Sequence, residues 1–475
     1  MTIDRIGPEP AADPAVRKRE QRGWYFYEWA NQTFNTSVTT VFGALYLTEV
    51  AKNDAKSNTL LNGPTPCIGP DGVEHALQSC DITLFGLLQF PAGSLWAYLL
   101  SVATVLQVVI LPIIGAIADR SQYKKRMLAI FTAVGASATA LMVFVAGDDW
   151  QLGAALFIVG EIGWGSSVVM YYAFLPEIAA ADERDHVSTR GWAFGYLGGG
   201  VALALQVLLV QFHETLGMTL EFAIRLCFLS SGAWWAFFAI IPLVILKNRQ
   251  PPHGPETGAS LLAAGFTELR DTTRKAMAFP LTLAFLGTYL IYTDGISTVA
   301  NVAALYGTEE LRFDTETLTI TILVIQFVAY VGAILHGLLA KRFGAKKTIL
   351  GSLVAWVVVL CFAYFVQEGQ ALQFYAVATG IGLVLGGTNA LSRSLYSQMI
   401  PAGKETQYFS LYQISEKGTS WLGPLLFGAI GQATGSFRPA IIALTAFFII
   451  GFVLLTRVPV RRAIRAVGNR EPAVL

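Results

Sequence analysis

Apolar stretches long enough to cross a membrane recur along the whole chain. A membrane-spanning helix needs roughly 20 mostly apolar residues. Twelve segments meet this requirement, at about 24–50, 93–118, 127–147, 152–175, 189–212, 222–246, 279–302, 315–339, 348–367, 370–392, 406–431 and 439–457. Only 14% of the 475 residues are charged, against about 25% in soluble proteins. The sequence therefore predicts an all-α polytopic membrane protein with twelve transmembrane helices.

Basic residues lie almost entirely on one side of these predicted spans. With the N-terminus in the cytoplasm, 28 of the 33 Lys and Arg residues fall on the cytoplasmic side. Such an excess marks the cytoplasmic face of membrane proteins. The first 23 residues lack the apolar core of a signal peptide. We therefore expect both termini in the cytoplasm and the protein in the plasma (inner) membrane.

The chain contains an internal repeat at an offset of 222 residues. Gly115, Arg120 and Lys124 match Gly337, Arg342 and Lys346, and further matches continue through the next two spans. Two six-helix halves of this kind bind substrate between them, near the middle of the membrane. The expected organisation is a cytoplasmic segment 1–23, bundles 24–246 and 279–457, a linker 247–278 and a cytoplasmic tail 458–475.

The repeated loop carries a recognisable motif. Gly-x-x-x-Asp-Arg-x-x-x-Lys-Lys, from Gly115 to Lys125, resembles the signature of the major facilitator superfamily, with Gln122 where that signature has Gly. The resemblance implies that Asp119 docks against the start of span 11 and steadies the outward-facing state. The second copy has Lys341 in place of this Asp. The alternative is that the basic residues only mark the cytoplasmic side.

A closer resemblance covers nearly the whole chain. Trp24-Tyr-Phe-Tyr-Glu28-Trp29-Ala30-Asn31 is similar to the opening of the Atg22-like (UMF1) subfamily, which usually has Asp at Glu28. Matching stretches include Tyr172–Ile178, Gly191–Gly200, Tyr292–Ile296, Gly386–Ser394 and Lys417–Pro424, and Glu416 is a departure. The resemblance implies vacuolar amino-acid efflux for the fungal members and leaves bacterial substrates open. Asn389, inside one of these motifs, joins the candidate cavity residues.

Polar side chains form a stripe along the first span of each half. In span 1 the stripe consists of Glu28, Asn31, Gln32, Asn35 and Thr39, and in span 7 of Asp294, Ser297, Thr298 and Asn301. Spacings of three, four and seven residues place each set on one helix face. Such a face cannot meet lipid without losing hydrogen bonds. We expect both stripes to line a wet cavity between the halves, although polar contacts that hold helices together are an alternative.

Charged residues inside the spans are candidates for mechanism, because a charge in hydrocarbon costs at least about 2.5–3.5 kcal/mol. Glu28, Asp294 and Glu161 are the candidates for proton coupling. Glu161 lies among glycines that permit close helix approach, and a structural hydrogen bond is its alternative role. Lys417 could counter a substrate carboxylate. The two stripe acids sit at different depths, so we do not expect them to be symmetry mates.

Charges near the cytoplasmic ends predict a gate. The loop with Glu177, Glu183 and Arg184 could form an inner latch beside the loop of Asp119 and Arg120, as an alternative to a solvated charge run. Such latches hold one of two alternating states. We assign Arg393, near the cytoplasmic end of span 10, to a gate or a lipid headgroup contact. Gly115 and Arg342 complete the gating candidates through the repeated motif.

The remaining patterns define what the protein binds. Cys67 and Cys80 share a loop on the outer side, where a disulfide could form. The five His residues show no metal-ligand spacing, and no phosphate-binding loop for ATP is present. We therefore expect no cofactor and no metal. The net charge of only +1 gives no reason to expect nucleic acid as a partner. The expected partners are a small solute, membrane lipids and protons as coupling ion, on a monomeric protein.

Together these features predict a secondary transporter rather than an enzyme. It would move a small polar solute, such as an amino acid, by alternating access, with efflux as the favoured direction and protons as the coupling ion. One alternative is a lipid flippase on the same fold, which predicts a greasier cavity and basic headgroup contacts. Another is a non-transporting receptor or scaffold, which has no need of a wet centre.

Overall fold

Helices account for most of the computed structural model. The structure describes residues 13–68, 79–84, 86–120, 123–249, 278–418, 422–434 and 436–475. Within these ranges only the backbone is described for Arg120, Ala304, Glu309, Thr315, Glu316, Lys417 and Gly418. The side chains of two site candidates, Arg120 and Lys417, therefore lie outside the described part.

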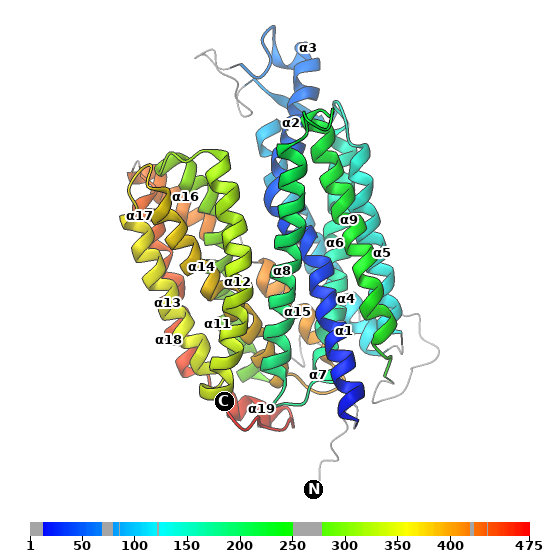
Figure 1. The fold of residues 1–475 in the computed structure, drawn as a ribbon, viewed down its shortest axis with the longest axis vertical. Coiled ribbons are helices and arrows are strands. Elements are labelled where there is room, and N and C mark those ends of the chain that lie inside the picture. Colours follow the sequence, from blue (N-terminus) through cyan, green and yellow to red (C-terminus); the bar gives the residue numbers. More distant parts are fainter. Residues whose placement is uncertain are drawn as a thin grey trace.

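The long helices gather in two groups (Figure 1). The first bundle contains α1 (Pro14–Thr33), η1 (Phe34–Phe42), α2 (Gly43–Ser57), α4 (Leu95–Arg120), α5 (Lys124–Leu141), α6 (Trp150–Ala173), α8 (Arg184–Gln211) and α9 (Leu220–Ile245). The second bundle contains α11 (Pro280–Leu305), η4 (Tyr306–Glu310), α12 (Thr315–Phe343), α13 (Ala345–Phe365), α14 (Ala371–Gln398), α15 (Glu405–Gly418), α16 (Leu422–Thr434), α17 (Arg438–Ala443) and α18 (Thr445–Arg457). The short elements are α3 (Thr59–Asn62), β1 (Asp81–Leu84), β2 (Leu88–Pro91), η2 (Ala92–Ser94), η3 (Met142–Phe144), α7 (Leu175–Ile178) and α19 (Val460–Ala466).

Nine helices among the described residues are long and apolar enough, taken alone, to cross a membrane. They correspond to predicted spans 2–6, 8–10 and 12. The other three spans are 1, 7 and 11, which carry buried polar residues such as Glu28, Asp294 and Gln413. These residues lower the hydropathy of their helices and need protein or water around them. In span 11, moreover, the described helices α15 and α16 have 14 and 13 residues, each shorter than a membrane crossing.

Span 1 is longer and less regular than predicted. It begins at Pro14, where Asp13 accepts a hydrogen bond from the N–H of Ala15 (2.8 Å), and continues through η1 to Ser57. The nine residues of η1 form a π-helix, in which Thr40 donates its hydroxyl to the carbonyl of Asn35. π-helical turns are rare and are found frequently at functional sites. In span 11 the structure describes α15 up to Gly418 and α16 from Leu422, and residues 419–421 lie outside the described part.

The two ends of the molecule differ. The start of α1, the short helix α19 and the C-terminus lie at one end, which we call the inner end, and α3 lies at the opposite, outer end (Figure 1). At the outer end β1 and β2 form an antiparallel hairpin, with Asp81 opposite Pro91. The sequence analysis did not predict this hairpin. At the start of α12 the exposed carboxylate of Asp314 accepts the N–H of Thr317 (2.9 Å).

Large apolar side chains face outward on both bundles. Val105 and Val109 of α4 are 64% and 50% exposed, and Phe362 of α13 is 65% exposed. A soluble protein rarely exposes apolar surface on this scale. The chain is therefore an integral, multi-pass membrane protein whose outer face meets lipid.

The C-terminal residues cross the inner end between the bundles. The side chain of Asn469 donates to the backbone oxygens of Gln398 and Ile400, at the end of α14. The N–H of Ala473 donates to the carboxylate of Asp182 in the first bundle (2.6 Å). The tail thus bridges the two bundles.

Candidate functional site

A buried ion pair joins the two bundles. The guanidinium Nη1 of Arg393 (α14) lies 2.5 Å from Oε1 of Glu28 (α1). Arg393 is fully buried and Glu28 is 4% exposed. Because neither charge reaches bulk water, each depends on the other for compensation. Removal of either charge would leave an uncompensated ion at the bundle interface.

Aromatic rings surround the guanidinium of Arg393. Its Cζ lies 4.6 Å from the ring of Tyr172 and 4.9 Å from that of Trp24. Tyr171 and Trp192 add rings at 5.8 and 5.5 Å. A cation over an aromatic face within about 6 Å is stabilised, by up to ~2 kcal/mol or more when desolvated. All four rings belong to the first bundle, so they hold a charge of the second bundle.

Further hydrogen bonds between the bundles gather near this pair. Ser188 (α8) accepts from Nε of Arg393 (2.9 Å) and donates to the carbonyl of Ala390 (2.6 Å). Ser394 donates to the carboxylate of Asp185 (2.5 Å), and Arg184 donates to the carbonyl of Ser397 (2.7 Å). We call these contacts, with the Glu28–Arg393 pair, the inner contact layer. They lie where α8 begins and α14 ends, so the structure is closed at the inner end.

Asp119 closes a second contact between the bundles. Its two carboxylate oxygens accept the N–H groups of Thr406 and Gln407, at 2.9 and 2.8 Å. Both N–H groups lie in the first turn of α15, where the helix favours a negative charge. A Cβ on Gly115 would come within 3.0 Å of the Thr406 carbonyl oxygen, so the close approach depends on glycine there. This geometry agrees with the docking that the superfamily motif implies for Asp119.

The loop charges that the sequence analysis assigned to a latch form their ion pairs mainly within the first bundle. Lys124 lies 2.5 Å from Glu177, and Arg249 lies 2.8 Å from Glu20. Glu183 contacts Arg17 (3.1 Å). These pairs all lie within the first bundle. The described contacts from this region to the second bundle do not involve Glu177 or Glu183. They come from Arg184 and from its neighbours Ala181, Asp182 and Asp185.

The stripe of span 1 points toward α8 and the second bundle over part of its length. Asn31 and Gln32 are buried, at 1% and 7% exposure. Neither side-chain amide atom of Asn31 has a hydrogen-bond partner among the described residues. Asn35 and Thr39 lie in η1 and are half-buried. Between them Thr36 accepts a hydrogen bond from Gln326 of α12 (3.3 Å), deeper than the inner contact layer.

The stripe of span 7 faces the start of α16 in span 11. Asp294 is 1% exposed, and neither carboxylate oxygen has a hydrogen-bond partner among the described residues. The nearby backbone is that of Gly423 at the start of α16, where Thr298 also packs. Ser297 is half-buried and Asn301 is exposed. Only the first part of this stripe is therefore enclosed.

The other candidates are dispersed. Glu161 in α6 is 3% exposed, and nearby Gly163 packs directly on Gly135 of α5, as the glycine pattern predicts. Asn389 in α14 is half-buried. Arg342 lies 5.3 Å from the ring of Phe343 and is exposed, away from the inner contact layer.

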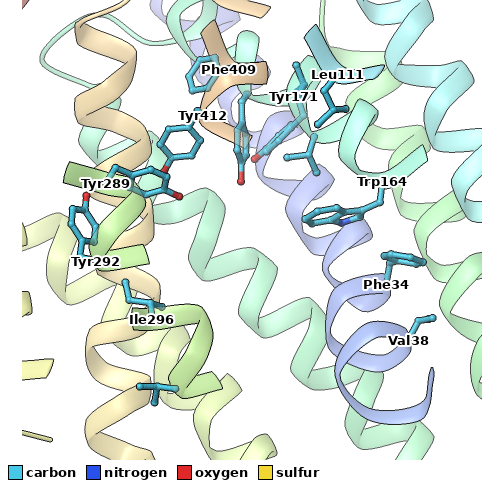
Figure 2. Close-up of a cluster of buried hydrophobic side chains, with 14 of the residues drawn as sticks. Phe34, Val38, Leu111, Trp164, Tyr171, Tyr289, Tyr292, Ile296, Phe409 and Tyr412 are labelled. Carbon is cyan, nitrogen blue, oxygen red and sulfur yellow. The ribbon is translucent and has the colours of Figure 1, made fainter. Parts of the chain in front are cut away.

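An aromatic cluster lies beside the ion pair on the second bundle. Figure 2 shows Tyr289 and Tyr292 of α11 close to Tyr412 of α15. Tyr289 and Tyr412 stack with centroids 4.3 Å apart, and Tyr172 of the first bundle contacts Tyr412 edge-on at 6.2 Å. Tyr292 donates or accepts a hydrogen bond with Ser392, next to Arg393. The cluster thus connects α11 and α15 to the aromatic cage, the rings of Trp24, Tyr171, Tyr172 and Trp192 around Arg393.

Two further sequence expectations concern covalent and metal chemistry. The structure joins Cys67 and Cys80 in a disulfide at the outer end. In the part of the chain that the structure describes, no group of three His, Cys, Asp or Glu side chains is placed to hold a metal ion.

Sequence reasoning missed several residues of the inner contact layer. Ser188 and Ser394 have no site role in the sequence analysis, nor does Trp24 of the rings around Arg393, although all three lie in motifs or repeat matches, and Asp185 enters it only as part of the latch loop. A usable signal was the density of aromatic residues at 24–27 and 171–172. Arg393, flanked by Ser392 and Ser394, was the cation that they enclose.

Known proteins resemble this chain along its length. An uncharacterised major facilitator-type transporter of Bacillus subtilis, YxiO, is 28% identical and aligns over 93% of this chain and 95% of its own. Autophagy-related protein 22-1 of Phaeosphaeria nodorum is 26% identical, over 94% of this chain and 91% of its own. The crystal structure of the human organic anion transporter MFSD10 superposes with a TM-score of 0.67 at 13% identity, covering 93% of this chain and all of that one.

These similarities confirm the fold and the class of protein. The fold is that of major facilitator transporters, with twelve helices in two bundles. The relatives are transporters rather than enzymes. The family model described as "Vacuole effluxer Atg22 like" matches residues 16–468. The chain therefore belongs to the Atg22-like family of major facilitator transporters.

Proposed function

We propose that this transporter carries a small zwitterionic solute, such as an amino acid, by alternating access with proton coupling. The observation that carries the proposal is the buried Glu28–Arg393 pair between the bundles. When the bundles separate at this place, Glu28 and Arg393 can each exchange the other for a new partner. A solute with both a carboxylate and an ammonium group offers one partner for each member of the pair.

Proton coupling is supported by the chemistry of the same pair. Protonation of Glu28 would remove its negative charge and weaken its hold on Arg393. The closed inner end would then lose its central contact. Asp294 is the second coupling candidate, because it is a buried carboxylate without a hydrogen-bond partner among the described residues. Glu161 is the third, buried in α6.

The remaining cavity candidates fit the same proposal. Asn31, Gln32 and Asn35 of span 1, with Ser297, Thr298, Asn301 and Asn389 of the second bundle, would present polar groups to the solute above the inner contact layer. Lys417 would add a cation. Glu177, Glu183 and Arg184 would support the gate from the first bundle, and Arg342 from the second. The expected domain boundaries are those of the two bundles and the linker 247–278.

Location and direction rest on different observations. The position of 28 of 33 basic residues supports cytoplasmic termini and a plasma (inner) membrane location. The family description, vacuole effluxer, supports efflux but refers to another membrane. Since both bundles and the binding path are contained in one chain, we propose a monomer. Because the direction of transport is part of the proposal, the assay must measure flux in both directions.

The test is solute flux in liposomes that contain the purified protein. Radiolabelled amino acids are followed with and without an imposed pH gradient, in both orientations of the gradient. We expect the gradient to drive accumulation, and Glu28→Gln and Asp294→Asn to reduce that accumulation. The control Glu49→Gln alters an exposed acid of α2 that pairs with Lys52 (2.9 Å), and should leave flux unchanged. Flux that ignores the gradient would disprove coupling, and absence of any amino-acid flux would disprove the substrate class.

A further inference from the structure

A cavity of about 460 Å³ opens on the second bundle, away from the contacts between the bundles. It lies among α12, α13 and α14. Its apolar wall consists of Leu335, Leu339, Phe343, Gly351, Ala355 and Val384. The adjoining faces of α12 and α13 carry exposed apolar residues, such as Leu338 (60%) and Val354 (50%). The cavity is therefore open toward the hydrocarbon of the membrane.

The cavity is empty of protein atoms beside Gly351. A Cβ placed on Gly351 would meet no atom within 4 Å. An unfilled hollow would deprive the side chains around it of dispersion contacts. In a membrane the material at hand to fill it is an acyl chain.

The polar groups at the floor of the cavity are already satisfied by one another. Nδ1 of His336 lies 2.8 Å from the carbonyl oxygen of Gly332, and its Nε2 lies 2.7 Å from the hydroxyl of Ser352. Nδ1 donates to the Gly332 carbonyl, so Nε2 of the neutral ring accepts the single hydroxyl hydrogen of Ser352, and the Thr348 carbonyl, 2.9 Å from that hydroxyl, is its alternative acceptor. His336 is only 5% exposed. These polar groups therefore need no hydrogen bond from a ligand. The deep part of the cavity is better suited to an apolar group.

A positive charge stands at the inner mouth of the cavity. Lys347 lines the cavity, is exposed and makes no ion pair with any described residue. Its neighbour Lys346 differs, because it donates to the carbonyl oxygens of Thr456 (3.1 Å) and Val458 (2.8 Å). Lys347 is in the first turn of α13, where the helix dipole is also positive. Ala355 lies eight residues further along this helix, about 12 Å deeper in the membrane.

We propose that this cavity is a binding site for an anionic phospholipid of the inner-end leaflet. The phosphate would lie at Lys347 and the start of α13, and one acyl chain would extend past Gly351 toward Ala355. Basic pockets between helices at the cytoplasmic side are suited to anionic headgroups, and a Lys near the surface contributes about 1 kcal/mol. The site is contained in the second bundle, so it does not depend on the transport path.

The test measures which lipids stay with the purified protein. The protein is exchanged into detergent with phosphatidylglycerol and phosphatidylcholine of identical acyl chains, and bound lipid is quantified by native mass spectrometry. We expect the wild type to retain phosphatidylglycerol about fivefold over phosphatidylcholine, which corresponds to the ~1 kcal/mol of one lysine. Lys347→Gln should lose this preference but keep lipid, and Gly351→Leu, which fills the hollow, should retain little of either.

Two controls make the result decisive. Arg126→Gln removes an exposed charge at the start of α5 in the first bundle, outside the cavity, and should retain lipid as the wild type does. Glu28→Gln alters the contact between bundles and should also leave retention unchanged. Thermal unfolding without added lipid checks that Gly351→Leu folds. The proposal is overturned by equal retention of the two lipids in the wild type, by equal loss in Arg126→Gln and Lys347→Gln, or by unchanged retention in Gly351→Leu.

Discussion

Glu28 and Arg393 are 365 positions apart in sequence, yet their side chains form a 2.5 Å ion pair that is shielded from water. One partner belongs to the first span and the other to the tenth. The contact therefore exists only while the two bundles are closed at the inner end. A charge pair in this position links the contacts of two residues to the way the two bundles pack.

Loss of the Glu28 charge should open the inner end. Glu28→Gln leaves Arg393 buried without a counter-ion, and breaking such a pair costs about 3–5 kcal/mol. Opening lets water reach Arg393 and relieves this cost. We expect a cysteine placed at the buried position Ala390 to react at least roughly tenfold faster with a membrane-impermeant maleimide. The background carries Cys361→Ser, because Cys361 is the exposed free cysteine among the described residues.

The matched control for that measurement is Glu20→Gln. Glu20 is as buried as Glu28 and forms a 2.8 Å ion pair with Arg249, but both residues pack on the first bundle. This variant should lower thermal stability without exposing position 390. Equal labelling of the Glu28 and Glu20 variants would show that the effect is general loosening rather than opening.

The aromatic cage should strengthen the closed state through the ring of Tyr172. Tyr172→Leu removes the ring closest to the guanidinium of Arg393, at 4.6 Å, and should cost up to ~2 kcal/mol of the closed state. Tyr172→Phe keeps a ring and should cost less. The same cysteine labelling at position 390 ranks the variants. A Phe variant that labels as fast as the Leu variant would argue against a contribution from the ring face.

The carboxylate of Asp119 should stabilise the closed inner end as a cap of α15. Asp119→Asn removes the negative charge and one of the two acceptors, which is expected to cost about 0.5–2 kcal/mol. We predict faster labelling at position 390 and slower solute exchange in liposomes. Asp314→Asn is the matched control, because Asp314 caps α12 within one bundle. Closure of the inner end should not depend on it.

The Cys67–Cys80 disulfide should stabilise the outer end without affecting closure. The two cysteines are 13 residues apart, and a loop of about 15 residues corresponds to about 3 kcal/mol in the chain-entropy account. Cys67→Ser with Cys80→Ser should increase protease cleavage near the β1–β2 hairpin and leave labelling at position 390 unchanged. Alkylation of both cysteines in the native wild type before any reduction would contradict the presence of the bond.

The helical architecture could be derived from the sequence because it depends on local properties. Long apolar segments, the 222-residue offset and the motif around Asp119 each leave a signal in a short window. The family resemblance followed from such windows as well. Gly115 and Asp119 lie at the contact with α15, which only the resemblance to the superfamily motif implied for Asp119.

The functional pairing could not be derived in the same way. Glu28 was expected in a wet cavity and Arg393 at a gate or a headgroup, but nothing local indicates that they meet. Their contact depends on how two bundles pack in one of several conformations. The π-helical turn of η1 was also missed, because hydropathy measures polarity and not the hydrogen-bond register of a helix.

The C-terminal tail has a mechanical consequence. Asn469 is fixed to the second bundle and Ala473 to Asp182 of the first. The four residues from one anchor to the other can extend by no more than about 14 Å. The tail is thus a tether of fixed reach, under which a narrow inner opening stays bridged and a wider one must release Asp182.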